Sequence, residues 1–420
     1  MPHLLCDSKH ALACSVAVNV ILVTVITAAI LSSLLDGTNV TIFMDQSPRL
    51  KVGQSSGSLQ IGKSTMRFST PIPTHDTRVR VRESHDYLDN IAHQVRCVLQ
   101  FVTYLPSPWE RNWYELSQKP GFADVNWVEG CKKLKLESIK VQRWLHKQDE
   151  RMNFRLDTTT KAKKTQNFQS DDWDVLSSLT FRNSCTNATV RVPIEPLVSF
   201  LRHPNTTCYS DDFEGVVVNK NYMFAPLSYE VIAKRAMHHH DRGAGMVTRV
   251  LMFDLGASLW DSGGGGASLS WFVKTYEDSG LKFDHIYAWE ATVYPPVTLF
   301  MDIPEKILHR LSYYNVPVDS TPQSKHNPLT TLLDVCTKDD YVIFKLDIDN
   351  ADLEQGIIRQ IMESQTLLHL IDEIYFEQHT RGTPMQRIGW GDTNVLGSVS
   401  DSYKLFSELR QNGVRAHSWV

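Results

Sequence analysis

The stretch VLMFDLGASLWDSGGGGASLSWF, residues 250–272, decides the fold of the C-terminal part of this 420-residue chain. An apolar run that ends in Asp254 and Gly256 predicts a buried strand followed by a tight turn, because glycine adopts backbone conformations that other residues avoid. A glycine run at 263–266 then precedes a helical stretch, which we predict over 267–279. A strand, a glycine turn and a helix in succession are typical of an α/β domain.

The same alternation continues to the C-terminus. The strand described above is predicted over 248–255, and further strands are predicted at 283–290, 341–347, 373–377 and 414–419. Further helices are predicted near 304–311, 327–336, 352–362 and 402–411. Strands that alternate with helices predict a parallel sheet covered on both faces. Four of the strands become acidic where they end, at Asp254, Glu290, Asp347 and Glu377. Since ligands bind at the carboxyl ends of the strands in such sheets, we expect a binding site at this edge.

Two of these positions suggest a nucleotide-like ligand. Gly256 allows the backbone to approach a ligand closely, and Glu290 is placed to accept hydrogen bonds from a ribose diol. No GKS or GKT follows the glycines, and no GxGxxG is present, so the sequence does not predict a phosphate-binding loop or a dinucleotide fingerprint. The ligand therefore need not contain a pyrophosphate.

Together with FKLDIDNADLE at 344–354, these residues resemble class I S-adenosylmethionine-dependent methyltransferases, and the FkbM-like branch in particular. The resemblance covers about residues 245–420 and implies an α/β fold with a Rossmann-like methyltransferase sheet. The chain differs from the family pattern in three places. Its glycines are displaced into the run at 263–266, Asn350 stands where the family has glycine, and Asp349 replaces a glutamate.

The resemblance implies S-adenosyl-L-methionine as cofactor and assigns residues to it. Asp254 and Gly256, with Ala257 beside them, match the first motif, which contacts the methionyl and adenosyl parts. Glu290 matches the acid that holds the ribose hydroxyls, and Asp347 matches the fourth-strand acid near the reactive methyl group. No metal is expected in this interpretation.

Methyl transfer to a hydroxyl also requires a base when the acceptor must lose a proton. The candidates at the strand ends are Asp347, Asp349, Glu377 and His379, and His326 is a further one. We predict Asp347 as the first choice and His379 as the second. The acceptor is expected to be an unidentified glycan or small molecule.

The N-terminus predicts a membrane segment. Residues 11–35 contain no charge, and as a helix they are long enough to cross a hydrocarbon core of about 30 Å. We expect a transmembrane signal-anchor after a short tail, residues 1–10; a cleaved signal peptide is the alternative. Sequons at Asn187 and Asn205 favour a single-pass type II glycoprotein of the endoplasmic reticulum or Golgi, because they are used on the luminal side.

Two regions connect the anchor to the α/β domain. Residues 36–80, rich in Ser, Thr, Gly and Pro, predict a flexible stem. Residues 81–240 predict an α+β accessory or acceptor-recognition region, with a helix over 85–105 and another in the basic stretch 131–164. That stretch holds eleven Lys and Arg against four Asp and Glu, so it either meets an acidic partner or is a solvated helix face.

Side chains of the accessory region leave several alternatives open. Cys185 and Cys208 bracket both sequons and are candidates for a disulfide; buried reduced thiols are the alternative. Tryptophans at 109, 113, 127, 144 and 173 are expected in the core, with an acceptor site as the alternative. The run 238–240 of three histidines is expected in a solvated turn, because adjacent side chains rarely converge on one ion.

Two other classes of protein compete with a methyltransferase. A luminal type II glycosyltransferase has the same anchor and stem, and Asp347-Ile-Asp349 has the DxD form that holds Mg²⁺ or Mn²⁺ with a nucleotide sugar. A membrane-anchored scaffold that keeps the fold without catalysis is the other. A net charge of −4 argues against a nucleic-acid partner, and nothing in the sequence determines the oligomeric state.

Overall fold

A computed structural model gives the fold of the chain. It describes residues 39–41, 50–51, 58–61, 64–69, 99–120, 127–156, 168–184, 186–209, 219–225, 249–261, 268–386, 390–391 and 393–419. The chain divides into two compact units, Met1–Gln94 and Val95–Val420. The predicted anchor, the glycine run and the histidine run all lie outside the described residues. Within the described residues, the structure contains no helix that is long and apolar enough to cross a membrane.

The first unit contains a small antiparallel sheet within the region predicted as a stem. Its strands run in the order β1-β4-β3-β2. They are β1 (Asn39–Thr41), β2 (Leu50–Lys51), β3 (Ser58–Ile61) and β4 (Ser64–Ser69). The Ser-, Thr-, Gly- and Pro-rich sequence of this region did not predict these strands.

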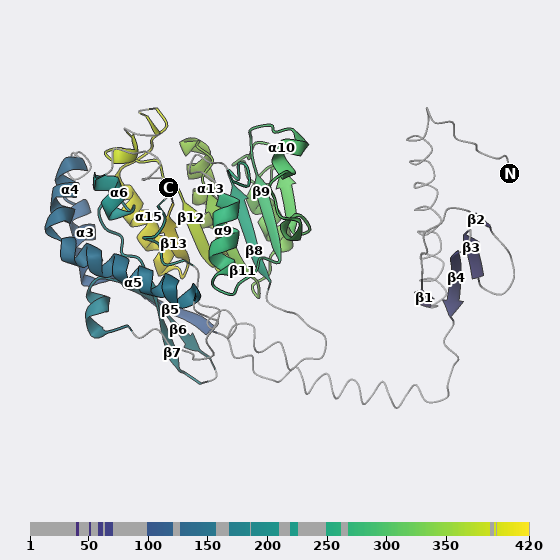
Figure 1. Cartoon of the computed structure of the whole chain (residues 1–420), viewed down its shortest axis with the longest axis horizontal. Helices are drawn as coiled ribbons and strands as arrows, with labels where there is room; N and C mark the ends of the chain where they lie inside the picture. Colours follow the sequence, from purple (N-terminus) through teal and green to yellow (C-terminus); the bar gives the residue numbers. More distant parts are fainter. Residues whose placement is uncertain are drawn as a thin grey trace. The chain divides into compact units, whose positions relative to one another are not determined.

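The C-terminal part of the second unit is built on a sheet of six strands. They are β8 (Val250–Leu255), β9 (His285–Trp289), β10 (Leu311–Tyr314), β11 (Tyr341–Leu346), β12 (Glu373–Phe376) and β13 (Arg415–Ser418). The order is β10-β9-β8-β11-β12-β13, and every neighbouring pair is parallel (Figure 1). Both central strands are buried along their whole length, as a sheet covered on both faces requires. The predicted Rossmann-like α/β architecture is confirmed at this level.

Helices connect these strands and cover both faces. They are α9 (Ser268–Glu277), α10 (Pro296–Phe300), α11 (Glu305–Leu308), α12 (Pro328–Val335), α13 (Ala351–Glu363), α14 (Gln365–Leu370) and α15 (Val399–Gln411). Trp271 of α9 contacts Tyr375, with ring centroids 6.3 Å apart, and Phe406 of α15 contacts Phe376 at the same distance. Because consecutive strand residues point to opposite faces, α9 and α15 lie on opposite sides of the sheet.

One strand of this sheet, β10, was not predicted. A helix was expected near 304–311, whereas the structure ends α11 at Leu308 and begins β10 at Leu311. This strand is short, partly exposed and pairs only with β9 among the described strands. Its four residues carry little periodicity, so only the pairing with β9 reveals the strand.

A second sheet precedes the first in the same unit. It has three antiparallel strands in the order β5-β6-β7, namely β5 (Leu99–Leu105), β6 (Ser177–Asn183) and β7 (Thr189–Ile194). The helix predicted over 85–105 is therefore wrong for Leu99–Leu105, and its earlier part, 85–98, lies outside the described residues. Phe101 of β5 packs against Phe181 of β6, with ring centroids 6.1 Å apart. This cross-strand packing prevails over the helix-like spacing of the apolar residues.

Helices of the accessory region pack around three buried tryptophans. The elements are α3 (Pro108–Ser117), α4 (Trp127–Leu136), α5 (Ser138–Leu156), a 3₁₀ turn η1 (Ser170–Asp174) and α6 (Pro204–Tyr209), so the helix predicted in the basic stretch is confirmed. Trp109, Trp113 and Trp144 are each 1% exposed and belong to the core, as expected. A disulfide joins Cys131 of α4 to Cys208 of α6, so the alternative pairing of Cys208 with Cys185 is wrong.

Buried ion pairs join the accessory region to the edge strand β13. Glu195 follows β7 and contacts His417 at 2.8 Å and Arg410 at 3.0 Å. Glu373 contacts the other ring nitrogen of His417 at 2.9 Å and Arg415 at 3.3 Å. Removing one member of such a buried network leaves an unpaired charge, so these contacts fix how the two sheets meet.

Candidate functional site

The chain reverses its direction across the six-stranded sheet between β8 and β11. From β8 the chain proceeds to β9 and β10 on one side, then crosses to β11 and continues to β12 and β13 on the other. In open α/β sheets the crevice at such a switch point, outside the carboxyl ends of the strands, is the ordinary place for a ligand. Asp254 lies near the end of β8 and Asp347 directly after β11, so the sequence placed both at this edge.

Gly256 is required by the close approach of the loops after β8 and β11. Its φ is +82°, and a β-carbon here would lie 1.7 Å from the carbonyl oxygen of Asp347. The N–H groups of Gly256 and Ala257 both donate to the carbonyl oxygen of Trp289, at 3.0 Å each. These two amides therefore hold the turn against the end of β9.

Glu290 follows β9 and binds the same turn from the other side. Its carboxylate accepts the N–H of Ser258 at 2.9 Å and the N–H of Thr292 at 2.6 Å, and the side chain remains partly exposed. The hydroxyl of Tyr313 on β10 donates to the carbonyl oxygen of Ser258 at 2.7 Å. The structure thus brings together Gly256, Ala257 and Glu290, three of the predicted cofactor residues.

Lys345, to which the sequence analysis assigned no role, lies between the two strand-end aspartates. Its ammonium group is fully buried, 2.9 Å from Asp347 Oδ2 and 3.4 Å from Asp254 Oδ1. It also donates to the carbonyl oxygen of Gly256 at 2.8 Å. Burial alone would lower the pKa of Lys345, but the two carboxylates outweigh it and raise the pKa above its ordinary value. The lysine is visible in the FKLDID segment of the sequence, but the sequence does not show that it is buried between two aspartates.

The two aspartates are in different environments. Asp254 is not exposed at all; Ser268 Oγ donates to it at 2.6 Å, and burial raises its pKa. Burial also acts to raise the pKa of Asp347, but the charge of Lys345 and hydrogen bonds, including one with Glu377, lower it. Trp419 Nε1 donates to Asp347 at 3.0 Å. Asp347 therefore favours its ionised form more strongly than Asp254 does.

Glu377 and His379, after β12, extend this group of side chains. Burial and the nearby charge of Asp347 raise the pKa of Glu377. His379 Nε2 lies 3.0 Å from Glu377 Oε2, and its ring stacks on Trp390 with centroids 4.7 Å apart. Burial would lower the pKa of His379, but the bond to Glu377 outweighs it and raises the pKa to about 9. The structure therefore brings the predicted Asp347 and His379 to one edge, linked through Glu377.

The accessory region contributes two cations that the sequence analysis missed. Arg202 Nη2 lies 3.9 Å from Glu377 Oε1. Lys220 Nζ lies 4.6 Å from the centroid of the Trp419 ring, and burial lowers the pKa of Lys220 to about 8 against the opposing charge of Asp347. No motif surrounds either residue, and only the packing of this region against β12 and β13 places them at the site.

Of the other two base candidates, Asp349 lies at the strand ends and His326 does not. Asp349 follows Asp347 in the loop before α13 and is exposed, and one of its oxygens lies within 4.8 Å of ligand atoms of Glu377 and His379. His326 lies in the loop before α12, where its N–H contacts Ser324 and its carbonyl oxygen accepts the N–H of Asp319. These contacts place His326 in its own loop rather than among the strand-end acids.

Comparison with known proteins finds no family model, no curated protein and no solved structure that matches this chain. The fold and the arrangement of the strand ends are therefore the basis for a functional proposal.

Proposed function

We propose that the chain is a membrane-anchored S-adenosylmethionine-dependent methyltransferase that methylates an oxygen of a glycan or small metabolite. The observation that carries the proposal is the junction of β8 and β9. There Glu290 holds the loop after Gly256 and keeps part of its carboxylate exposed. An acid in this position accepts hydrogen bonds from a ribose diol in nucleotide-binding α/β domains. The switch point beside it supports the same location for the ligand.

The charged groups after β11 and β12 fit the part of the reaction that takes place at the methyl acceptor. S-adenosylmethionine, when bound, supplies a methyl group on a positively charged sulfur. The acceptor oxygen forms its new bond to carbon as the sulfur–carbon bond breaks, and its proton passes to a base. Asp347 is our first choice for that base, since it is ionised and partly exposed, and His379 is the second. Glu377 lies between them and shares hydrogen bonds with both.

The proposed location also has support in the accessory region. The asparagines of both sequons, Asn187 and Asn205, are exposed. The disulfide between Cys131 and Cys208 is of a kind that persists in oxidising compartments. Both features agree with a luminal C-terminal portion and with membrane attachment through residues 11–35.

The competing glycosyltransferase needs both aspartates of Asp347-Ile-Asp349 at one metal ion. Asp347 contacts Lys345 and Trp419, whereas Asp349 lies with Glu377 and His379. Both aspartates lie near Glu377, but Asp347 is already paired with the buried ammonium group of Lys345, which makes it a poor metal ligand and favours the methyltransferase.

Ligand binding by the full-length protein tests the proposal. S-adenosylmethionine is titrated into the wild type, into Glu290→Gln, and into Glu305→Gln as a control on an exposed acid of α11. Loss of a hydrogen bond to a charged group costs about 1.5–3 kcal/mol, so Glu290→Gln should weaken binding by roughly 10- to 100-fold while the control binds normally.

Two results would contradict the methyltransferase, and a third would contradict only the role of Glu290. Wild type that binds no S-adenosylmethionine excludes it directly. Equal affinity in Glu290→Gln and wild type removes the role of Glu290. Binding of a nucleotide sugar that requires Mn²⁺, measured in parallel, would instead identify a glycosyltransferase, and no binding in either titration would favour the scaffold.

A further inference from the structure

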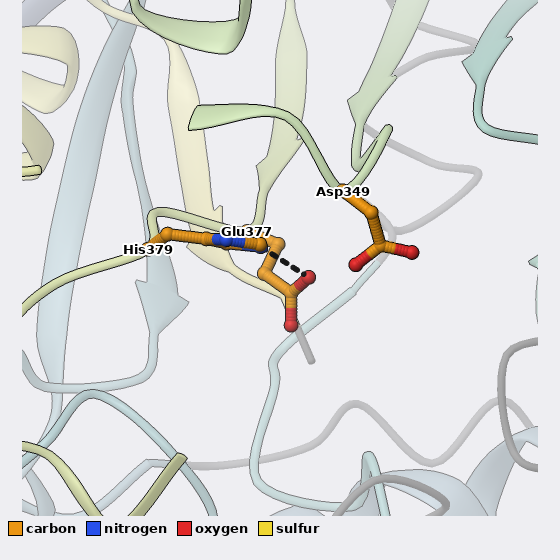
Figure 2. Close-up of side chains that lie close together, drawn as sticks. All are labelled: Asp349, Glu377 and His379. Atoms are coloured by element: carbon orange, nitrogen blue, oxygen red, sulfur yellow. Dashed lines mark hydrogen bonds and ion pairs between the residues drawn. The ribbon is translucent and has the colours of Figure 1, made fainter. Parts of the chain in front are cut away.

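We propose that Asp349, Glu377 and His379 form a binding site for one divalent cation of the Mn²⁺ type. The loop after β11 supplies Asp349, and the loop after β12 supplies the other two. One ligand atom from each residue lies within 4.8 Å of the other two. Figure 2 shows one carboxylate oxygen of Asp349 and one of Glu377 on facing sides, with the ring of His379 beside Glu377.

The distances are close to those of a coordinated ion. With metal–ligand bonds of about 2.1 Å, adjacent ligand atoms lie about 3.0 Å apart and opposite ones about 4.2 Å apart. The distance from His379 Nε2 to Glu377 Oε2 is 3.0 Å, which matches an adjacent pair. The widest separation in the group is at most 4.8 Å, so closing it needs a movement of about half an ångström. Asp349 is exposed, and rotation of its side chain supplies that movement.

The orientation of His379 is that of a metal ligand. Its Nδ1 lies 2.9 Å from the carbonyl oxygen of Asn394, which only accepts, so Nδ1 carries a proton. Without a metal, a second proton on Nε2 holds the hydrogen bond to Glu377 Oε2, and a bound cation would displace that proton and take the Nε2 lone pair. A backbone carbonyl that fixes the second nitrogen is typical of metal-binding histidines. Trp390, stacked on the ring, holds its plane.

An independent observation beside these ligands is an unpartnered carboxylate oxygen on Glu354. The residue is 1% exposed, and its Oε2 has no hydrogen-bond partner among the described residues. Its other oxygen accepts the N–H of Ile348, the residue before Asp349, at 3.0 Å. Glu354 lies close enough to His379 and Glu377 to interact electrostatically with both, and burial raises its pKa to about 8. A buried carboxyl oxygen without a partner is costly, and a cation in this group would stabilise the ionised form of Glu354.

The ligand set selects the kind of cation. Carboxylates suit Mg²⁺, Ca²⁺ and Mn²⁺, whereas imidazole suits the transition metals, so one histidine with two carboxylates fits Mn²⁺ or its tighter-binding relative Zn²⁺. Ca²⁺ takes six to eight oxygen ligands and fits poorly. Three protein ligands leave coordination positions open. If the proposed methyltransferase function holds, an acceptor oxygen would occupy one of them, and this last point rests on that function.

The test measures Mn²⁺ binding to the full-length protein after metal removal with EDTA, with free Mn²⁺ followed by electron paramagnetic resonance. Wild type should bind one Mn²⁺ per chain, with Zn²⁺ as a competitor and Ca²⁺ without effect. Asp349→Asn should weaken binding by at least about 10-fold, because it removes a charged ligand. Asparagine suits this position, since Asp349 has a φ of +54° and asparagine tolerates left-handed backbone. Asp352→Asn, an exposed acid of α13, is the matched control and should bind as wild type does.

The site would be refuted if wild type bound no stoichiometric Mn²⁺ or Zn²⁺, or if Asp349→Asn and Asp352→Asn bound Mn²⁺ equally well. Glu377→Gln provides a second variant, which keeps the buried shape and should also weaken binding. S-adenosylmethionine is titrated separately in EDTA. Mn²⁺ binding without cofactor binding would support the metal site and refute only the methyltransferase function. Cofactor binding without Mn²⁺ binding would support the methyltransferase function and refute only the metal site.

Discussion

Replacing Gly256 by alanine tests the packing of β8 against β11 at the switch point. Alanine in left-handed backbone costs roughly 1–2 kcal/mol, and Gly256 has a φ of +82°. The added β-carbon would lie 1.7 Å from the carbonyl oxygen of Asp347, far below the 3.0 Å that real contacts keep, so one of the two loops must move by more than an ångström. Overpacking of this kind costs a further 1–3 kcal/mol, roughly. We expect Gly256→Ala to lower the free energy of unfolding by about 3 kcal/mol.

Gly280→Ala is the matched control. Gly280 has a φ of +79°, and nothing lies within 4 Å of its added β-carbon, so only the backbone cost of roughly 1–2 kcal/mol applies. Urea unfolding of the full-length protein, followed by tryptophan fluorescence, gives both values from the shift in midpoint at constant slope. Equal losses for the two variants would refute the close approach of Gly256 to the loop after β11.

Three further perturbations have definite outcomes. Lys345→Met leaves two carboxylates without their cation and should cost about 4 kcal/mol by urea unfolding, and adding Asp254→Asn should recover part of that loss. Reducing the disulfide between Cys131 and Cys208, or replacing both cysteines by serine, should cost about 4 kcal/mol, because the bond closes 77 residues of chain; a change below about 1 kcal/mol would argue that the bond does not constrain the unfolded state. Burial would raise the pKa of Glu373, but its histidine and arginine partners outweigh it and lower the pKa from 4.5 to about 2. Its contribution of about 3 kcal/mol is therefore present above pH 4.5 and lost as the pH falls toward 2, and urea midpoints measured across this range should show a shallower slope in Glu373→Gln.

Much of the site was predictable because each strand carries its own burial pattern. Apolar runs that end in Asp254, Glu290, Asp347 and Glu377 mark buried strands whatever lies beside them, and parallel strands present these ends at one edge. The glycine at 256 was also predictable as a turn. The physical reason for this glycine is its contact with the loop after β11. That contact was not predictable, because the loop is distant from Gly256 in the sequence.

Errors arose where pairing between distant segments decides the structure. Leu99–Leu105 has helix-like spacing of apolar residues, yet it forms β5 because β6 lies beside it. Leu311–Tyr314 is too short for a pattern and becomes a strand by pairing with β9. From its position in the sequence, Cys208 was expected either to form a disulfide with Cys185 or to remain a reduced thiol. The packing of α4 against α6 makes Cys131 its disulfide partner instead.

The sequence by itself determined the α/β class, the positions of the strand ends and their acidic character, since these follow from local hydrophobic patterns. Only the tertiary structure decided which charged side chains lie close enough to interact. It buries Lys345 between two aspartates, brings Lys220 and Arg202 from the accessory region to the strand ends, and sets Asp349 beside Glu377 and His379. The physical reason is that a side chain's charge and partners depend on burial and on neighbours distant in the chain, which local periodicity does not encode.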